Sequence, residues 1–371
     1  MRFLINNSNR GTNGQAYSIG AMVRRVFSLP TMLSVAFGLA IIGFLLWRVL
    51  DFEWDEFVKH LTGINWWLFI LAGLLYYVSF WFRGWRWQFI YNSVAVRSDN
   101  ADMRRSPAPN VPTMAGLILS GWFVNSVMFF RIGDAYRGWA LADRTSSDTP
   151  TALGTVFAER VQDMAVVLVL VVVSAVWALL VDGFAASGRI VDVAVIVVAV
   201  ASGLVLLLLL VLYVMGKAGD RFARWLPARF REQYLHFQDG TLDSFKGGGM
   251  SRLIALGVLG WLMEVLRFYF VAHAMGLEMA MSIAMFAALA NAIMTTIPVP
   301  GGLGFVETAL VTILLLVGLS HTDAFTLTLL DRAISWLSVV VLGGIAFFGM
   351  TLKRTANSRL TVAEEASANG G

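Results

Sequence analysis

Charged residues interrupt several apolar segments of this chain, where they could bind a charged ligand. Glu159 and Asp163, four residues apart, share one face of a helix that continues as an apolar run, and Arg160 lies between them. Other charged residues inside apolar segments are Glu264, Arg267, Glu307, Asp331 and Arg332. An ionisable group inside a membrane costs at least ~2.5 kcal/mol on insertion scales, so such groups normally face a bundle interior and mark substrate or ion paths.

A run of helix-breaking residues lies in the apolar stretch 281–319. Its members are Pro298, Pro300, Gly301, Gly302 and Gly304, and Glu307 follows them. Proline removes a backbone donor and glycine disfavours helix, so this run must interrupt a helix where no bulk water satisfies the freed groups. Such a break is tolerated where the backbone lines a cavity or is packed inside protein, which indicates a transport or binding site.

Arginines accompany the predicted breaks. Arg131 and Arg137, with Asp134 between them, directly follow a weakly apolar segment. Free backbone N–H groups at a helix N-terminus favour an anion, and arginine can bind a phosphate with two hydrogen bonds. For Glu264 with Arg267, an ion pair that fixes helix register is an equally good interpretation.

A further arginine pair, Arg83 and Arg86 beside Trp87, is expected at a helix end. Arginine and tryptophan in that position most often anchor a helix at the membrane interface, and they could also guide a lipid to the entrance of a groove.

Composition fixes the broad class. The 371 residues are 58% hydrophobic and 14% charged, and the mean hydropathy is +0.71, which predicts an all-α polytopic membrane protein. The chain has no cysteine, and its four histidines form no ligand pair at helical spacing, so neither a metal site nor another cofactor is predicted. Basic residues concentrate in loops, where they set membrane orientation, so nucleic acid is not an expected partner.

Apolar segments define a transmembrane domain over residues 29–352, between disordered cytoplasmic tails at 1–28 and 353–371. A helix that spans a membrane needs roughly 20 residues. The segments are 31–50, 66–82, 113–130, 150–180, 190–214, 251–275, 281–298, 303–319 and 326–351. Aromatic residues alternate with arginines across 216–250, which predicts an amphipathic helix on the cytoplasmic surface.

The distribution of positive charge predicts the topology. Basic residues cluster in the N-terminal tail, in 83–112, in 216–252 and after 352. The positive-inside rule therefore places these segments, and with them both termini, in the cytoplasm. The expected location is the cytoplasmic membrane. Three apolar segments lie between the basic loops 83–112 and 216–252, which are on the same side of the membrane. Only an even number of them can cross, and 113–130 is the segment that does not. The same count from 216–252 to the C-terminus shows that 281–298 and 303–319 together make no net crossing. We therefore expect about six transmembrane helices and two opposed re-entrant hairpins, as in an inverted repeat.

Four motifs in order resemble the flippase-like transmembrane family, named for the membrane half of the bifunctional lysylphosphatidylglycerol synthase, the multiple peptide resistance factor. They are Arg83-x-x-Arg86-Trp87, Asn125 with Arg131-x-Gly133-Asp134-x-x-Arg137, Glu159-Arg160-x-x-Asp163, and Pro298-x-Pro300-Gly301-Gly302-Leu303-Gly304-x-x-Glu307. The resemblance covers about 31–351. The family often has a proline where this chain has Phe129, so the first break is expected to be less sharp.

The resemblance implies a stand-alone lipid translocation module. Family members are linked to aminoacylated phospholipids, polyprenyl-phosphate-linked sugars and hopanoid-type lipids, so these and anionic phospholipids are the expected partners. A separately encoded lipid-modifying enzyme and a second copy of the chain are further candidate partners. Only about twenty polar residues follow the last span, so the aminoacyl-transferase domain, and with it enzyme activity, is not expected.

The leading hypothesis is a flippase or scramblase-like transporter whose polar groove carries a phosphate-containing headgroup while the tails stay in lipid. The predicted groove residues are Arg131, Asp134, Arg137, Glu159, Arg160, Asp163, Glu264, Arg267, Glu307 and Arg332. A second hypothesis is an ion-coupled transporter of a small anion, which shares the broken helices. A third is a membrane transferase with Glu159 or Asp163 as base.

Overall fold

The computed structural model describes residues 53–181, 188–247, 249–296 and 299–352. The predicted tails, the predicted first span at 31–50 and Pro298 lie outside the described residues. Among the described residues all regular elements are helical, and five helices are long and apolar enough to cross a membrane. The prediction of an all-α polytopic membrane protein is confirmed.

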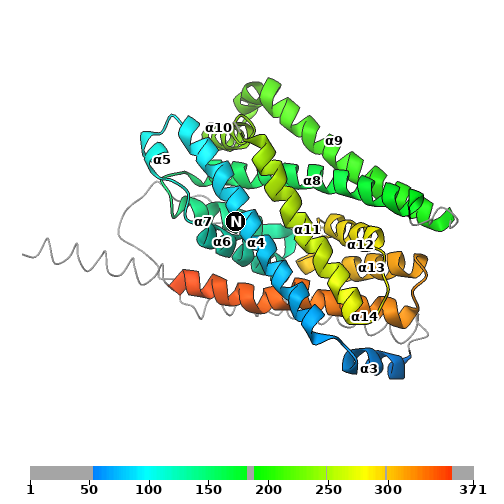
Figure 1. Ribbon diagram of the computed structural model, residues 1–371. Coiled ribbons are helices and arrows are strands. Elements are labelled where there is room, and N and C mark those ends of the chain that lie inside the picture. Colours follow the sequence, from blue (N-terminus) through cyan, green and yellow to red (C-terminus); the bar gives the residue numbers. More distant parts are fainter. Residues whose placement is uncertain (1–52, 182–187, 248, 297–298, 353–371) are drawn as a thin grey trace, which may run out of the picture.

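Five long helices form the frame (Figure 1). They are α4 Trp66–Arg97, α8 Thr149–Leu180, α9 Gly188–Trp225, α11 Met250–Ala274 and a last span, His321–Leu352, that begins with α14 His321–Arg332. Side-chain caps fix where several of them begin: Asn65 accepts from the N–H groups of Trp67 and Leu68, and Asp148 accepts from that of Thr151. The last span continues through two π-helical turns, η4 Ala333–Leu337 and η5 Val339–Gly343.

The long helices differ in how much of their apolar surface the protein itself covers. In α11, which packs along α4, 50% of the most apolar window is buried, whereas in α9 only 11% is buried. An apolar helix that the protein leaves uncovered needs an apolar surrounding, and a lipid bilayer provides it. The outer position of α9 in Figure 1 therefore marks a lipid-facing side of the bundle.

Two pairs of short helices lie inside this frame. The first pair is α6 Val111–Val127 and α7 Ile132–Ala142, joined at η1 Phe129–Arg131. The second pair is α12 Met281–Met294 and α13 Phe305–Leu316, joined through η3 Pro300–Gly302. At 1.5 Å per residue these helices are about 17–26 Å long, shorter than the ~30 Å hydrocarbon core of a bilayer.

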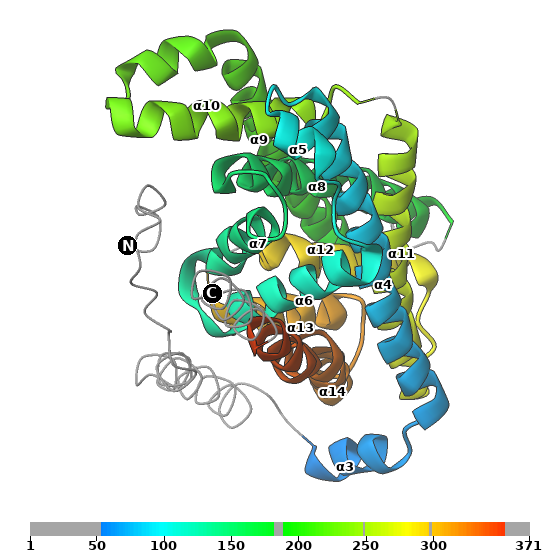
Figure 2. The ribbon, with the colours of Figure 1, turned by 90° about the vertical axis from the view of Figure 1, so that its left-hand side faces the viewer.

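The two hairpins enter from opposite ends of the bundle. In Figure 1, α6 and α7 lie toward the end that carries α5 Ala101–Arg105, and α12 and α13 lie toward the end where α14 begins. Figure 2 shows both hairpins between α8 and α14. Their tips meet, because Arg131 Nη1 donates to the carbonyl of Thr295 at 2.5 Å and η1 contacts η3. The predicted pair of opposed re-entrant hairpins is confirmed.

Two boundaries differ from the sequence-based expectation. The helix α4 does not end near residue 82 but continues to Arg97, so Arg83 and Arg86 lie inside it rather than in a basic loop. The amphipathic segment 216–250 is also divided: its first part extends α9 to Trp225, and α10 Ala228–Asp243 follows.

Glycines explain why α10 packs on α8. A Cβ at Gly154 or at Gly240 would overlap with backbone of the other helix, and Thr241 Oγ1 donates to the carbonyl of Gly154 at 3.3 Å. One face of α10 is therefore covered by protein rather than by lipid headgroups.

Candidate functional site

Carboxylates on α8 face arginines on α4 at the centre of the bundle. Arg86 Nη2 lies 2.6 Å from Asp163 Oδ1 and 3.4 Å from Glu159 Oε1, and Arg83 Nη1 lies 3.9 Å from Asp163 Oδ2. Spacings of three residues on α4 and four on α8 place each pair on one helix face. All four side chains are at most 3% exposed. The expectation that Arg83 and Arg86 anchor at the membrane interface is therefore wrong.

The first hairpin adds a second layer of charge. Arg137, on α7, pairs with Glu159 and stacks over Trp87, with 4.4 Å between the guanidinium carbon and the ring centroid. Arg160 Nη2 donates to Asp134 Oδ1 at 2.8 Å, and Arg131 Nε lies 3.5 Å from Asp134 Oδ2. The hairpin thus brings its charges onto the same face of α8 as α4 does.

Glycine and asparagine give the hairpin its shape. A Cβ at Gly133 would overlap with the carbonyl oxygen of Gly121, and a Cβ at Gly121 would press on the side chain of Arg137. Asn125 Oδ1 accepts the N–H of Gly133 at 2.8 Å. At the tip, Phe130 and Arg131 have φ values of 62° and 50°, a left-handed conformation that is uncommon outside glycine. The first break is sharp although it lacks the proline typical of the resembled family.

The helices α11 and α14 extend the charges toward the second hairpin. Glu264 bridges Arg83, at 3.4 Å, and Arg267, at 3.3 Å, and Arg267 pairs in turn with Asp331. Trp261 stacks on Arg83, with 4.6 Å between the guanidinium carbon and the ring centroid. Asp331 was not among the predicted groove residues, although its charge inside an apolar span was the same signal that identified Arg332.

These contacts make one connected set, which we call the charged network. Its members are Arg83, Arg86, Arg131, Asp134, Arg137, Glu159, Arg160, Asp163, Glu264, Arg267 and Asp331. It contains six arginines and five carboxylates, so the ionised network carries one excess positive charge.

The remaining two predicted groove residues stabilise the Pro-Gly break. Glu307 Oε2 accepts the N–H of Gly304 at 2.7 Å, and its Oε1 lies 2.7 Å from Arg332 Nε. Arg332 Nη2 donates to the carbonyl of Gly301 at 2.7 Å. Gly301, Gly302 and Gly304 have φ values of 56°, 69° and 85°, which favour glycine. Glu307 and Arg332 therefore form an ion pair, and each makes a hydrogen bond to one backbone group of the break.

The charged network is accessible at one edge. The side chains of Arg131, Asp134 and Arg160 are 29%, 21% and 22% exposed, whereas its other members are nearly or fully buried. Three arginines surround Asp134 there, since Arg137 Nη1 also lies 3.8 Å from it. Among the described residues, Nε of Arg137 and Nε of Arg160 have no hydrogen-bond partner. This edge has more guanidinium donors than carboxylate acceptors, which favours an anionic ligand.

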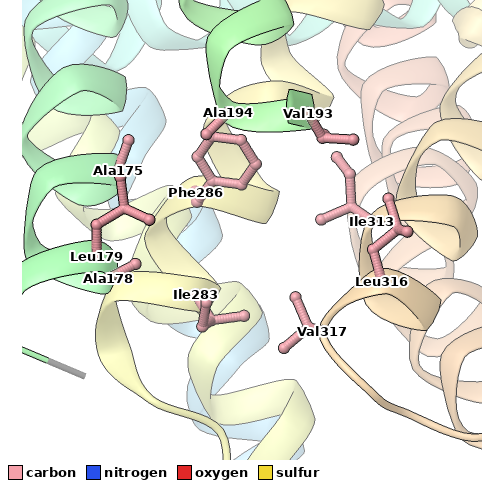
Figure 3. A pocket seen from close by; sticks show the side chains of 10 residues that line it. All are labelled: Ala175, Ala178, Leu179, Val193, Ala194, Ile283, Phe286, Ile313, Leu316 and Val317. Atoms are coloured by element: carbon pink, nitrogen blue, oxygen red, sulfur yellow. The ribbon is translucent and has the colours of Figure 1, made fainter. Parts of the chain in front are cut away.

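An apolar hollow lies in the same half of the bundle as the second hairpin. It opens between α8, α9, α12 and α13 (Figure 3), and its empty volume is about 400 Å³ with the open side included. Its lining residues are Ala175, Ala178, Leu179, Val193, Ala194, Ile283, Phe286, Ile313, Leu316 and Val317. Asp163 and Ala175 are twelve residues apart on α8, so the hollow lies about 18 Å along that helix from the charged network.

One comparison with known proteins covers nearly the whole chain, and two others cover parts of it. A family model described as the lysylphosphatidylglycerol synthase TM region matches residues 33–343. A UPF0104 membrane protein of Methanocaldococcus jannaschii is 32% identical over 227 residues, which are 61% of this chain and 93% of that protein. A UPF0104 membrane protein of Methanothermobacter thermautotrophicus is 35% identical over 94 residues, 25% of this chain and 28% of that protein. No solved structure matches the chain.

Proposed function

We propose that this chain, which belongs to the family of the lysylphosphatidylglycerol synthase TM region, moves a phosphate-containing lipid headgroup across the membrane through the charged network. Family membership supports a lipid-related role in a membrane, and the long apolar helices make the chain a multi-pass membrane protein. The finer assignment to headgroup transport rests on the structure of the network itself.

One observation carries the proposal. Arg131, Arg137 and Arg160 converge on the single carboxylate of Asp134, at the partly exposed edge of the network and beside the tips of both hairpins. A headgroup phosphate can replace Asp134 as the common acceptor, because it offers several oxygens to the same guanidinium groups. When the phosphate leaves, Asp134 again neutralises the arginines, so the empty site does not contain an unpaired cluster of positive charge.

The apolar hollow supports a lipid rather than a water-soluble anion. A lipid needs an apolar surrounding for its chains while its headgroup is in the polar site, and the hollow provides one. Transport of a small anion needs no such hollow. Glu159 and Asp163 are each held in an ion pair with arginine, so neither carboxylate is free to contact a substrate proton, which supports transport rather than transferase chemistry.

Orientation and partners complete the proposal. The end that carries α5 and α10 faces the cytoplasm, both termini are cytoplasmic, and the membrane is the cytoplasmic one. The proposed partners are those named above: the lipid classes, a separately encoded lipid-modifying enzyme and a second copy of the chain.

The first prediction concerns Arg131 in reconstituted vesicles. Arg131→Gln should slow transbilayer movement of a fluorescent phosphatidylglycerol at least about tenfold, because it removes one charged phosphate donor worth about 1.5–3 kcal/mol. Quenching of the outer-leaflet fluorophore by an impermeant reductant measures the rate.

The matched control is Arg229→Gln, an exposed arginine on α10 that stacks on Phe230 and forms no ion pair within the described chain; it should keep the wild-type rate. Wild-type movement in the Arg131 variant would refute the assignment. Flux of inorganic phosphate into vesicles made only of lipid and this protein would instead favour the small-anion transporter.

A further inference from the structure

A second cluster of ionisable side chains lies outside the charged network, where α3 Trp54–Thr62 contacts the beginning of α14 and Asp323 is eight residues before Asp331. Glu56 and His60 are one turn apart on α3, so they share a face of that helix. Asp323 lies in the first turn of α14, and the two helices are also joined by the N–H of Glu53, which donates to Thr322 Oγ1 at 3.2 Å. Three side chains from two helices thus converge at one point.

The distances within this cluster suit a shared ion. One ligand atom from each of Glu56, His60 and Asp323 lies within 4.8 Å of the other two. His60 Nε2 and Asp323 Oδ1 are 2.7 Å apart, yet both are buried atoms without a hydrogen-bond partner in the described part of the chain. Each of the two atoms can therefore serve as a ligand to an ion.

Coordination is compatible with this arrangement. Two ligands that are each about 2.0–2.1 Å from one tetrahedral ion lie about 3.3 Å from each other. His60 Nε2 and Asp323 Oδ1, now 2.7 Å apart, would therefore separate by about 0.6 Å to hold the ion between them.

We propose that Glu56, His60 and Asp323 bind a divalent transition-metal ion, with zinc as the best match, and thereby join α3 to α14. One imidazole nitrogen and two carboxylates are ligands that zinc accepts, whereas calcium requires six to eight oxygens. The two carboxylates offset the charge of the ion, and α3 lies against the helix whose other end carries Asp331 and Arg332. The proposal does not depend on the proposed lipid transport.

A second histidine–carboxylate pair provides the matched control. His236 Nδ1 lies 3.1 Å from Asp148 Oδ2, and both side chains are about 40% exposed. That carboxylate oxygen already accepts from Thr151 Oγ1 at 2.9 Å, and the residues described around the pair do not supply a third metal ligand.

The test is zinc binding to the full chain in detergent after treatment with a chelator. Calorimetric titration with zinc chloride should show one saturable site per chain, and zinc should raise the unfolding temperature. His60→Ala and Asp323→Asn should each weaken binding more than about 100-fold, because loss of even an outer partner typically costs 10–100-fold. His236→Ala should bind zinc like the wild type.

Three outcomes would overturn the proposal: a wild-type chain that binds no zinc, an unchanged affinity in His60→Ala, or loss of binding in His236→Ala. The unfolding temperature of each variant without zinc shows whether it is folded. If His60→Ala does not fold, Glu56→Gln, at a side chain that is not fully buried, gives the same test.

Discussion

At the scale of single residues, Asp163 shows how one carboxylate pairs with arginines from two helices. It lies 2.6 Å from Arg86, 3.9 Å from Arg83 and 3.7 Å from Arg160, and its side chain is 1% exposed. A buried charge that loses its partner cannot be solvated instead, so removal of one partner destabilises a protein far more than the net value of the pair suggests.

We therefore predict that Asp163→Asn lowers the free energy of unfolding by about 3–5 kcal/mol, as expected for one missing partner in a buried ion pair. Denaturant unfolding in detergent measures the change. The control is Asp243→Asn, because its partner Lys246, 2.9 Å away, has a side chain that is 64% exposed. A surface pair of this kind should contribute less than about 1 kcal/mol. Equal losses in both variants would contradict the structural importance of Asp163.

Arg83 and Arg86 show what local patterns do not contain. Two arginines next to Trp87 in sequence are typical of a helix end at a membrane interface. Here both arginines are buried inside the bundle, so the interpretation as interface anchors is wrong. The carboxylates that neutralise them lie on α8 and α11, at positions 163 and 264, and a search for acidic residues near them in sequence does not find these partners. The available signal was the near balance of arginines and carboxylates inside apolar segments.

At the scale of elements, the first hairpin depends on the close contact of α6 with α7. Gly121 and Gly133 face each other at the contact, and Arg137 passes next to Gly121 to reach Glu159. A side chain at either glycine would separate the two helices and displace the guanidinium.

The corresponding prediction is that Gly133→Ala costs several kcal/mol of stability, since its Cβ would overlap with the Gly121 carbonyl, and overpacking typically costs about 1–3 kcal/mol before lost ion pairs are added. Gly73→Ala is the control. Gly73 lies within α4 with no atom within 4 Å of an added Cβ, so alanine should stabilise that helix by up to about 1 kcal/mol. Thermal unfolding of the two variants in the same detergent measures the difference. An unfolding temperature of Gly133→Ala equal to that of the wild type would show that the contact between α6 and α7 can relax.

At the scale of the whole molecule, the opposed hairpins bring two backbone breaks together within the bundle. Arg131 satisfies the carbonyl of Thr295 on the other hairpin, and Glu307 satisfies the N–H of Gly304 within its own. Each break thus has partners inside the protein, as unpaired backbone groups in a bilayer require. This arrangement also fixes which loops share a side of the membrane.

The cysteine-free sequence makes that arrangement testable. Cysteines at the exposed positions Lys59 and Glu278 should react with an impermeant thiol reagent in intact cells. Cysteines at Arg104 and Arg229, at the opposite end of the bundle, should react only after the membrane is permeabilised. Reaction of both pairs from the same side would contradict the topology, and reversed accessibility would invert the proposed orientation.

The sequence alone determined the class of the protein, most of its apolar helices and the positions of its two breaks. Long apolar runs require a membrane, and residues such as Pro300 and Gly301 interrupt helices through their own backbone chemistry, so both signals are local. Charge counts between basic loops then predicted that the hairpins are opposed.

Only the tertiary structure decided which charges meet. The contact of Arg83 with Glu264 spans 181 positions, and the convergence of Glu56 and His60 on Asp323 spans more. Such pairings depend on how helices pack and rotate against each other, which residue types do not specify. The structure thus assigned Glu307 and Arg332 to the Pro-Gly break and showed that arginines converge on Asp134, because packing, not sequence order, sets the distances between charges.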